Sequence, residues 1–244
     1  DPKTNQVVVT ADRTVSQAEW TKLTKVVDGL GEKAELKRIK GEFKPYIAGG
    51  DKIIGPVTGG TVFCSLGFNV VKDGQPYFIT AGHCTNETSV WADAGQELGS
   101  TVESSFPDND FGLVKYSGNA DHPSEVNLYN GSTQKITKAG DATIGQEVTR
   151  SGSTTHVHTG TVTDTDATVN FRDPEDPDSG TVNTVNGLIE TDVCAEPGDS
   201  GGPLFSGDTA IGLTSGGAGN CTAGGVTFFQ PVTEALSTFG AEIG

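Results

Sequence analysis

The chain has 244 residues, of which 34% are hydrophobic and 34 are glycine, and its net charge is −16. This length fits one large β-type domain or two small ones, and no apolar run reaches the ~18 residues of a membrane helix. A chain this acidic repels nucleic-acid backbones and anionic lipids, so we expect neither nucleic acid nor a membrane as partner, and we expect a soluble monomer. It begins at Asp1 without a basic, apolar leader, so any export signal is expected to have been removed or left out.

The first 46 residues differ in composition from the rest. Residues 1–46 hold nine Lys/Arg and seven Asp/Glu, a net charge of +2, whereas residues 47–244 carry −18. The Lys-rich, glycine-poor texture ends at residues 45–50, Pro-Tyr-Ile-Ala-Gly-Gly. We therefore predict two parts, 1–46 and 47–244.

The local patterns of the first part predict a strand, a helix and a second strand. Residues 6–10 form an apolar strand candidate, and residues 34–43 form another. Ser16 and Glu19 match a capping box, and apolar residues recur at helical spacing as far as Leu30. A unit of roughly 45 residues is small enough to need a partner surface for stability.

From Ile47 onward, short segments rich in Val, Ile, Thr and Phe alternate with Gly, Asn and Asp turns, as in an all-β fold. No helical crossover separates them, which favours antiparallel sheets or barrels. One clear helix begins at Pro231, whose fixed φ suits a first turn. The strand candidates are 61–71, 77–81, 96–104, 111–116, 134–137, 146–150, 156–164, 167–171, 181–191, 204–205, 209–215 and 226–230.

The four cysteines form two local pairs in sequence, Cys64 with Cys84 and Cys194 with Cys221. Three pairings are possible from the sequence alone. Because no C-x-x-C metal pattern is present, we expect structural disulfides and an oxidising compartment rather than a metal site.

Ser200 lies in the segment 194–203, Cys-Ala-Glu-Pro-Gly-Asp-Ser-Gly-Gly-Pro. Glycines on both sides suit a tight turn whose backbone N–H groups converge. A serine hydroxyl becomes an effective nucleophile once a base takes its proton and N–H donors await the oxyanion. The alternative for such a segment is an ordinary polar surface turn.

The base must come from four histidines, and none follows Ser200 in the sequence. This order excludes an α/β-hydrolase, whose histidine follows its serine. His83 ends an apolar strand beside Cys84 and is our candidate base, although a packed strand-end histidine is the plain alternative. We expect His122, in a polar turn before proline, to be exposed. His156 and His158 share one face of a strand, where a metal pair is a minor alternative.

For the acid, Asp110 lies at the start of an apolar strand in Asn-Asp-Phe-Gly-Leu-Val. A carboxylate buried there would hold the imidazole of His83 in the required tautomer and stabilise the imidazolium. Asp108, in a more polar setting, is the rival candidate.

The motifs TAGHC, NDFGLV and GDSGGP, in that order, resemble the chymotrypsin-fold serine proteases, and residues 47–244 as a whole resemble the secreted bacterial streptogrisins. Residues 1–46 resemble the C-terminal part of a streptogrisin pro-region. The resemblance implies a chymotrypsin-like, all-β fold of two six-stranded antiparallel β-barrels that divide near 135–145, with a C-terminal helix and a small α+β pro-segment. It also implies an extracellular serine endopeptidase without metal or cofactor, and the disulfides Cys64–Cys84 and Cys194–Cys221.

The resemblance assigns roles to matching positions. Ser200 would attack the scissile carbonyl, His83 would accept its proton, and Asp110 would orient His83. The oxyanion hole would be the N–H groups of Gly198 and Ser200. Asp199 needs a cationic partner to hold this loop open, and we predict that Arg150 supplies it.

A specificity pocket is implied with walls at Ala195, Glu196, Pro197, Ser215, Gly216, Gly217 and Thr227. It lacks the acid of a trypsin-like pocket, and Thr214 stands where the glutamate-specific relatives carry histidine. Small walls leave room for a large apolar side chain, so we expect cleavage after Phe, Tyr or Leu. Tyr46–Ile47 then offers a self-cleavage site.

The pro-segment 1–46 is expected to act as inhibitor and folding assistant of the protease, aided by the opposite charges of the two parts. Polypeptides are the expected substrates. The acidic loop 173–178 is expected to be solvated, with Ca²⁺ binding as the lesser alternative. The rival to an active enzyme is a catalytically silent homologue that binds protein, and an esterase remains only as a side activity.

Overall fold

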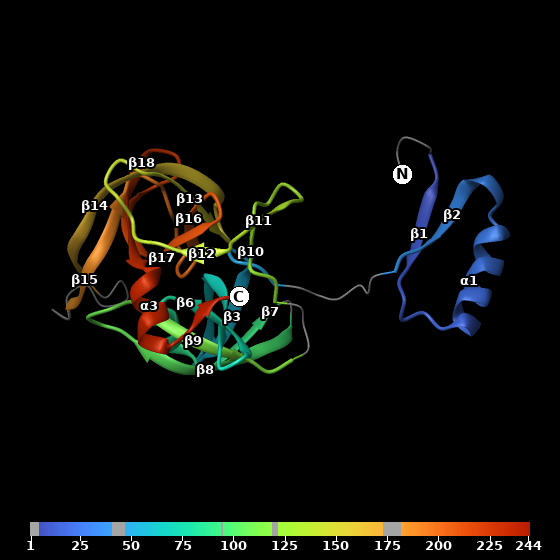
Figure 1. Cartoon of the computed structure of the whole chain (residues 1–244), viewed down its shortest axis with the longest axis horizontal. Helices are drawn as coiled ribbons and strands as arrows, with labels where there is room; N and C mark the ends of the chain where they lie inside the picture. The colour runs from blue at the N-terminus through green and yellow to red at the C-terminus, as the bar shows by residue number, and fades with distance from the viewer. Residues whose placement is uncertain (1–4, 41–46, 94, 119–121, 173–181) are drawn as a thin grey trace. The chain divides into compact units, whose positions relative to one another are not determined.

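The computed structural model describes residues 5–40, 47–93, 95–118, 122–172 and 182–244. The chain separates into two compact units, Asp1–Pro45 and Tyr46–Gly244 (Figure 1). Of the predicted features, Tyr46 and the acidic loop 173–178 lie outside the described residues. None of the helices in the described ranges is long and apolar enough to cross a membrane.

The first unit contains two parallel strands and one helix. Strands β1 (Val7–Ala11) and β2 (Ala34–Arg38) pair in parallel, and α1 (Gln17–Asp28) with a short 3₁₀ helix (Gly31–Lys33) connects them. The capping box is confirmed, because Ser16 Oγ accepts a bond from the Glu19 N–H and Glu19 Oε2 accepts one from the Ser16 N–H.

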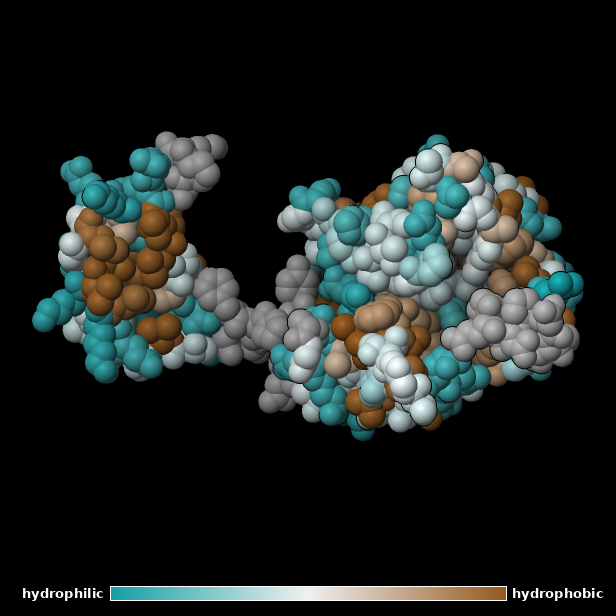
Figure 2. Space-filling model, turned by 180° about the vertical axis from the view of Figure 1, so that it is seen from behind, coloured by the Kyte–Doolittle hydropathy of each residue, from teal (hydrophilic) through white to brown (hydrophobic). Residues whose placement is uncertain are grey.

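This unit buries little of its apolar surface. Among its described residues, only Ala11, Asp12 and Val27 are buried. Val26 is 65% exposed and Leu30 is 52% exposed, and Figure 2 shows hydrophobic side chains gathered on one face of the unit. A core this small contributes little stability by itself.

The second unit begins with an antiparallel sheet of eight strands in the order β19-β5-β6-β9-β8-β7-β3-β4. A short helix, α2 (Gly82–Glu87), follows β6. The strands are β3 (Lys52–Val57), β4 (Gly60–Ser65), β5 (Phe68–Lys72), β6 (Gln75–Thr80), β7 (Val90–Asp93), β8 (Gln96–Ser105), β9 (Phe111–Tyr116) and β19 (Glu242–Ile243).

The second sheet has the order β12-β17-β16-β13-β14-β15-β18, and a further pairing of β17 with β18 joins six of its strands into a ring. A hairpin of β10 (Glu125–Asn127) and β11 (Thr133–Lys135) precedes it. The strands are β12 (Lys138–Ala139), β13 (Glu147–Gly152), β14 (His156–Arg172), β15 (Val182–Thr191), β16 (Pro203–Ser206), β17 (Thr209–Asn220) and β18 (Gly224–Pro231), and α3 (Val232–Phe239) follows them. The prediction of an all-β fold with a C-terminal helix is confirmed.

The sequence analysis did not predict five short strands, β3, β7, β10, β12 and β19, and the division into strands differs from the prediction at two further places. The single strand expected at 61–71 divides into β4 and β5 at Gly67, where a Cβ would collide with the main chain of Ile79 and Gly201. The two strands expected at 156–164 and 167–171 form one strand, β14, whose pairing with β15 shifts register three times between Val162 and Val169. The polar Asp-Thr-Asp residues there interrupt the alternation, but β-bulges accommodate them without ending the strand.

Three apolar clusters stabilise the second unit. One fills the first sheet around Trp91 and Phe78, and another fills the second sheet around Phe229 and Ile189. The third contains side chains from both sheets together with Phe239 and other residues of α3. This shared core fixes the two sheets against each other. The predicted catalytic residues lie where the two sheets meet.

Candidate active site

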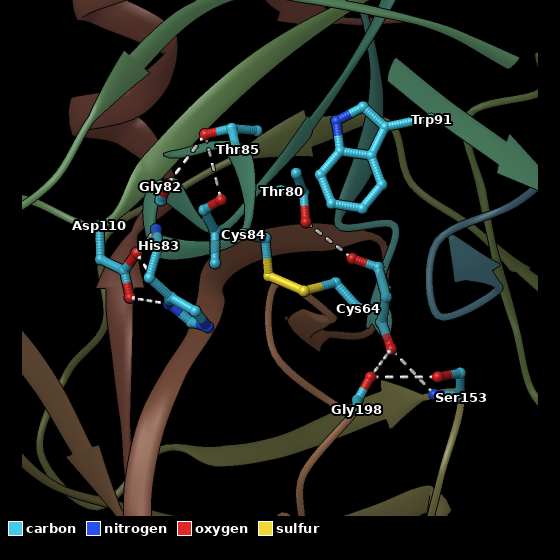
Figure 3. The surroundings of a disulfide bond; sticks show 12 residues. Cys64, Thr80, Gly82, His83, Cys84, Thr85, Trp91, Asp110, Ser153 and Gly198 are labelled. Carbon is cyan, nitrogen blue, oxygen red and sulfur yellow. Dashed lines mark hydrogen bonds and ion pairs between the residues drawn. A yellow bond between two sulfur atoms is a disulfide. The ribbon is translucent and has the colours of Figure 1, made fainter. Parts of the chain in front are cut away.

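His83 lies in the first turn of α2, directly after β6. The Cys64–Cys84 disulfide ties α2 to β4 beside it (Figure 3). Gly82 is required here, because a Cβ at this position would meet the Phe111 nitrogen at 2.8 Å. The close approach of α2 to the start of β9 brings His83 within reach of Asp110.

His83 and Asp110 form a fully oriented pair. The imidazole Nδ1 donates to Asp110 Oδ2 at 2.9 Å, and the backbone N–H of His83 donates to Oδ1 at 2.8 Å. Ser215 Oγ donates to Oδ2 at 2.5 Å. Since Asp110 is 1% exposed and its oxygens accept these three donors, the imidazole is fixed with its proton on Nδ1, and Nε2 is left for other chemistry.

The electrostatics of this pair favour a protonated imidazole. Burial lowers the pKa of His83, but the charge of Asp110, its hydrogen bond and the more distant charge of Glu87 together outweigh burial. The pKa of His83 is therefore raised above the usual 6.5. An imidazole tuned upward in this way is a stronger base.

Asp108 occupies a different position from Asp110. Its N–H donates to the Thr184 carbonyl at 2.9 Å, and its carbonyl accepts from Asn186 N–H at 3.0 Å. Asp108 has a φ of 76°, in the left-handed region, and forms a parallel bridge to Val185. Asp108 thus connects the β8–β9 turn to β15 through its backbone, and Asp110 is the residue that reaches His83.

The turn that carries Ser200 is held by bonds to both sheets. The Ser200 carbonyl accepts from Ser65 N–H at 2.8 Å, and Gly201 N–H donates to the Thr214 carbonyl at 2.7 Å. Gly201 has a φ of 79°, and a Cβ there would meet the Ala81 nitrogen at 2.8 Å. Ser200 therefore lies in a turn packed directly against the segment that leads into His83.

Gly198 has a φ of 100°, which favours glycine. Its carbonyl accepts from Ser65 Oγ at 2.8 Å and from Ser153 Oγ at 3.1 Å (Figure 3). Among the residues that the structure describes, the N–H groups of Gly198 and Ser200 have no acceptor. Hydrogen bonds to its carbonyl thus hold Gly198 in place, while the N–H groups of Gly198 and Ser200 remain available to bind a ligand.

Asp199 and Arg150 are both fully buried, and Nη1 of Arg150 lies 3.4 Å from Oδ2 of Asp199. Arg150 Nε donates to the Cys194 carbonyl at 2.9 Å, and Nη2 bonds to Thr155 Oγ1. Thr155 Oγ1 in turn donates to Asp199 Oδ2 at 2.6 Å. Burial lowers the pKa of Arg150, and the charges of Asp199 and Glu196 oppose this effect.

Asp199 also accepts three main-chain N–H bonds. Its carboxylate receives Thr154 N–H at 2.9 Å, Thr155 N–H at 3.1 Å and Glu196 N–H at 3.0 Å. A buried carboxylate with this many donors is fully satisfied. The turn 196–202 is therefore built around the Asp199 side chain.

The residues predicted to line a pocket lie on adjacent segments. Gly216 pairs with Phe228 and Gly217 with Thr227 across β17 and β18, and the Cys194–Cys221 disulfide joins this region to the segment 195–197. Glu196 Oε1 accepts from Cys221 N–H at 3.1 Å. Thr227 is 2% exposed, whereas Gly217 is exposed. The carboxylate of Glu196 is thus engaged with the main chain of Cys221.

The other histidines are not part of the His83–Asp110 pair. His122 is partly buried and packs on Tyr116 with ring centroids 3.6 Å apart, so the expectation that it is exposed was wrong. His156 stacks on Tyr129 at 4.2 Å, while His158 lies near the Cys194–Cys221 disulfide. In the described ranges, each group of three potential metal ligands includes two disulfide-bonded cysteines, which lack the thiolate that binds metals.

Two groups of side chains were missed by the sequence analysis. Ser65, Ser153, Thr154 and Thr155 surround Gly198 and Asp199. The run Ser-Gly-Ser-Thr-Thr after Arg150 was a possible signal for them. The second missed side chain is Gln230, whose Oε1 accepts from Asp110 N–H at 2.8 Å. The sequence signal for it was a single amide in the apolar run Val-Thr-Phe-Phe-Gln-Pro-Val.

Comparison with known proteins agrees with this geometry. Residues 56–238 match the Trypsin family, and residues 1–31 match the alpha-lytic protease prodomain. Streptogrisin-D from Streptomyces griseus is 64% identical over all of this chain, which spans 60% of that relative's length. Streptogrisin-A from the same organism is 50% identical over all of this chain and 76% of its own length.

Solved structures agree as well. The chymotrypsin of Cellulomonas bogoriensis is 41% identical, with a TM-score of 0.68 over 82% of this chain and 98% of its own. A glutamic acid-specific serine protease that binds substrate through a histidine triad is 42% identical, with a TM-score of 0.72 over 81% of this chain and 100% of its own. The chain therefore belongs to the trypsin family of serine proteases, in its bacterial streptogrisin branch, and carries an alpha-lytic protease prodomain before its protease domain.

Proposed function

We propose that this chain is a secreted serine endopeptidase that cleaves polypeptides after large apolar or aromatic residues and is made as a proenzyme. The observation that carries the proposal is the oriented His83–Asp110–Ser215 arrangement beside the turn that contains Ser200. Family membership supports the reaction class. The residue preference rests on the uncharged residues of β17 and β18 that are predicted to line the pocket.

In the proposed reaction, Ser200 Oγ attacks the scissile carbonyl carbon while His83 Nε2 takes the hydroxyl proton. The tetrahedral oxyanion is held by the N–H groups of Gly198 and Ser200, which have no acceptor among the described residues. His83 then gives the proton to the leaving amine, and an acyl-enzyme ester remains on Ser200. Water, activated by His83, hydrolyses the ester, and Asp110 stabilises the imidazolium in both halves.

Arg150 replaces a freed N-terminal amine as the partner of Asp199 in this proposal. The ion pair and its Thr155 bridge support this role. The segment after Tyr46 is held elsewhere, because Ile47 is 2% exposed and its carbonyl accepts from Asn69 Nδ2 at 2.8 Å. Activity would then be independent of an inserted N-terminus.

The expected preference follows from what surrounds the predicted pocket walls. Glu196 is engaged by Cys221 N–H, so its carboxylate is poorly placed to attract Lys or Arg. Thr214 Oγ1 donates to the Gly202 carbonyl and is 2% exposed, so it offers no group for a glutamate side chain. Phe, Tyr or Leu before the cut is the remaining class, and Tyr46 fits it.

The first unit would act as inhibitor and folding assistant. Its match to the alpha-lytic protease prodomain, its exposed apolar residues and its charge of +2 against −18 support this role. A unit with so small a core would gain stability from any partner surface that buries its exposed apolar residues.

The decisive experiment is a set of peptides that differ only at the residue before the cut. Peptides with Phe, Tyr or Leu should be cleaved at least tenfold faster than those with Glu or Lys, and the opposite order would contradict the assignment. Ser200→Ala is the control, and it should leave its own Tyr46–Ile47 bond intact while the wild-type enzyme cleaves that bond in trans.

A fluorophosphonate probe separates the active enzyme from a catalytically silent, protein-binding homologue. After removal of the pro-segment, the wild-type chain should be labelled at Ser200 and Ser200→Ala should not. An unlabelled wild-type chain that still binds polypeptides would favour the silent homologue.

A further inference from the structure

Asp110 is held by two different side chains from the second sheet. Ser215 from β17 binds its carboxylate, and Gln230 from β18 binds its main chain, since Gln230 Oε1 accepts from Asp110 N–H at 2.8 Å. Gln230 is 0% exposed, although glutamine is mostly an exposed residue in folded proteins. Its contact with Asp110 spans 120 positions in the sequence.

The direction of the Gln230 amide is fixed by a second contact. Gln230 Nε2 donates to Glu234 Oε2 at 2.8 Å, and Glu234 lies in the first turn of α3, four positions further on. If the amide were reversed, its NH₂ group would face Asp110 N–H, so that two donors would meet and Asp110 would lose its acceptor. Glu234 therefore keeps the oxygen of Gln230 pointed toward Asp110.

The backbone of Gln230 is itself held in the second sheet. Gln230 pairs with Leu213 in β17, and the next residue, Pro231, precedes α3. Leu213 and α3 belong to the apolar cluster shared by the two sheets. The acceptor that Asp110 uses is thus mounted beside the apolar cluster that the two sheets share.

We propose that Gln230 is a positioning residue for the proposed catalytic acid, and that Glu234 sets the direction of its amide. This inference rests on the proposed function, in which Asp110 orients His83. A carboxylate that must keep Nδ1 of His83 and Ser215 Oγ within bonding distance needs a fixed main chain as well as a fixed side chain. Gln230 supplies the main-chain contact from the second sheet.

The chemistry at position 230 demands an amide. One end must accept from a main-chain N–H, and the other must donate to the carboxylate of Glu234. A glutamate at 230 would place two carboxylates face to face, and a methionine of similar length would leave Asp110 N–H buried without an acceptor. Glutamate at 230 combined with glutamine at 234 would restore the pattern with the donor on the other residue.

The test uses the full chain after self-processing, with kcat and KM measured on one Phe-containing peptide. Gln230→Glu should lower kcat at least tenfold with KM changed less than threefold, and Gln230→Met should lower kcat at least fivefold. Glu234→Gln should lose two- to threefold in kcat, since its amide oxygen still faces Gln230 Nε2. The double variant Gln230→Glu/Glu234→Gln should recover at least half of the decrease in log kcat that Gln230→Glu alone causes.

Gln75→Glu is the matched control, because it makes the same chemical change at an exposed position in β6 and should leave kcat unchanged. The proposal is overturned if Gln230→Glu and Gln230→Met keep kcat within twofold, or if their loss lies in KM. It is also overturned if the double variant is as impaired as Gln230→Glu. If Gln230→Glu does not fold, Gln230→Met is interpreted by the same criteria, and failure of both to fold would assign Gln230 to stability and overturn the positioning role.

These outcomes are distinct from failure of the proposed function. A wild-type chain that neither cleaves peptides nor reacts with fluorophosphonate contradicts the proposed protease activity itself. A wild-type chain that is active, with Gln230 variants equally active, contradicts only the positioning role.

Discussion

Asp110 and Asp199 are both buried carboxylates beside the same candidate site, but their partners differ in kind. Asp110 is bound by an imidazole, a hydroxyl and one main-chain N–H, whereas Asp199 is bound by three main-chain N–H groups, a hydroxyl and a nearby guanidinium. Histidine titrates near neutral pH and arginine does not. The first carboxylate is therefore coupled to a group whose charge changes during reaction, and the second belongs to a framework whose charge stays constant.

The largest effect is expected when the coupled carboxylate is neutralised. Asp110→Asn should lower kcat about 10⁴-fold, because an amide favours the wrong imidazole tautomer. The melting temperature should stay near that of the wild type, since the amide keeps most of the hydrogen bonds. A kcat within tenfold of the wild type would contradict the role of Asp110.

Removal of Arg150, the cation beside Asp199, should have the next largest effect on activity and stability. Arg150→Ala leaves Asp199 buried beside an empty space, and breaking a buried ion pair of this kind costs about 3–5 kcal/mol. Both the free energy of unfolding and kcat/KM should fall. Urea unfolding and peptide cleavage measure the two.

Lys138→Ala is the control for Arg150→Ala. The Lys138–Asp208 pair has a similar separation, 3.3 Å, but both side chains are largely exposed. Because water screens such pairs, this substitution should change neither quantity appreciably. Wild-type activity and loop geometry in Arg150→Ala would refute the proposed part of the ion pair.

Removal of each disulfide should affect a different kinetic parameter, because the two disulfides lie on different sides of the site. Replacing both cysteines of either bridge by alanine should cost about 2–5 kcal/mol of stability. Loss of Cys64–Cys84 should act mainly on kcat, because Cys84 follows His83, and loss of Cys194–Cys221 should act mainly on KM and residue preference. Steady-state kinetics on Phe and Leu peptides measure this split, and equal effects of both losses on kcat would contradict it.

The smallest effect is a displacement of the pH profile. Since the pKa of His83 is raised, the acid limb of kcat/KM should have its midpoint above 6.5. Protonation of His83 then stabilises the folded state fully below pH 6.5, and this contribution is lost as the pH rises through the raised pKa.

NMR titration of the histidine ring checks the origin of that displacement. Asp110→Asn removes the charge that raises the pKa and leaves the burial that lowers it, so the His83 midpoint should fall below 6.5. A midpoint that does not move in Asp110→Asn would show that Asp110 is not the cause.

The sequence was sufficient for the family and for the all-β fold with its terminal helix, because short motifs and strand-like segments are local patterns. The contacts of Gln230 and Thr155 could not be predicted from the sequence. Gln230 meets Asp110 across 120 positions, and Thr155 meets Asp199 across 44. Nothing in the residues around Gln230 or Thr155 shows which distant residue each of them will contact.

Some predicted strand ends were wrong for a reason that is also physical. Gly67 ends a strand because of what Ile79 and Gly201 place beside it, and β14 continues through a polar stretch because β15 tolerates bulges. His122 was expected in solvent but packs on Tyr116. In each case a tertiary neighbour decided the outcome, and local composition could not identify that neighbour.

Strand β19 has a consequence for how the protease unit folds. Glu242 pairs with Val71 and Ile243 with Val70, so that a strand near the end of the sequence borders the sheet built from the beginning of the unit, roughly 170 positions away. The entropy of closing so large a loop is lost before the pairing forms, which slows folding. The pairing of β19 with β5 therefore waits until the chain between Val71 and Glu242 has been made, and a covalently attached pro-segment would be present at high effective concentration throughout that time.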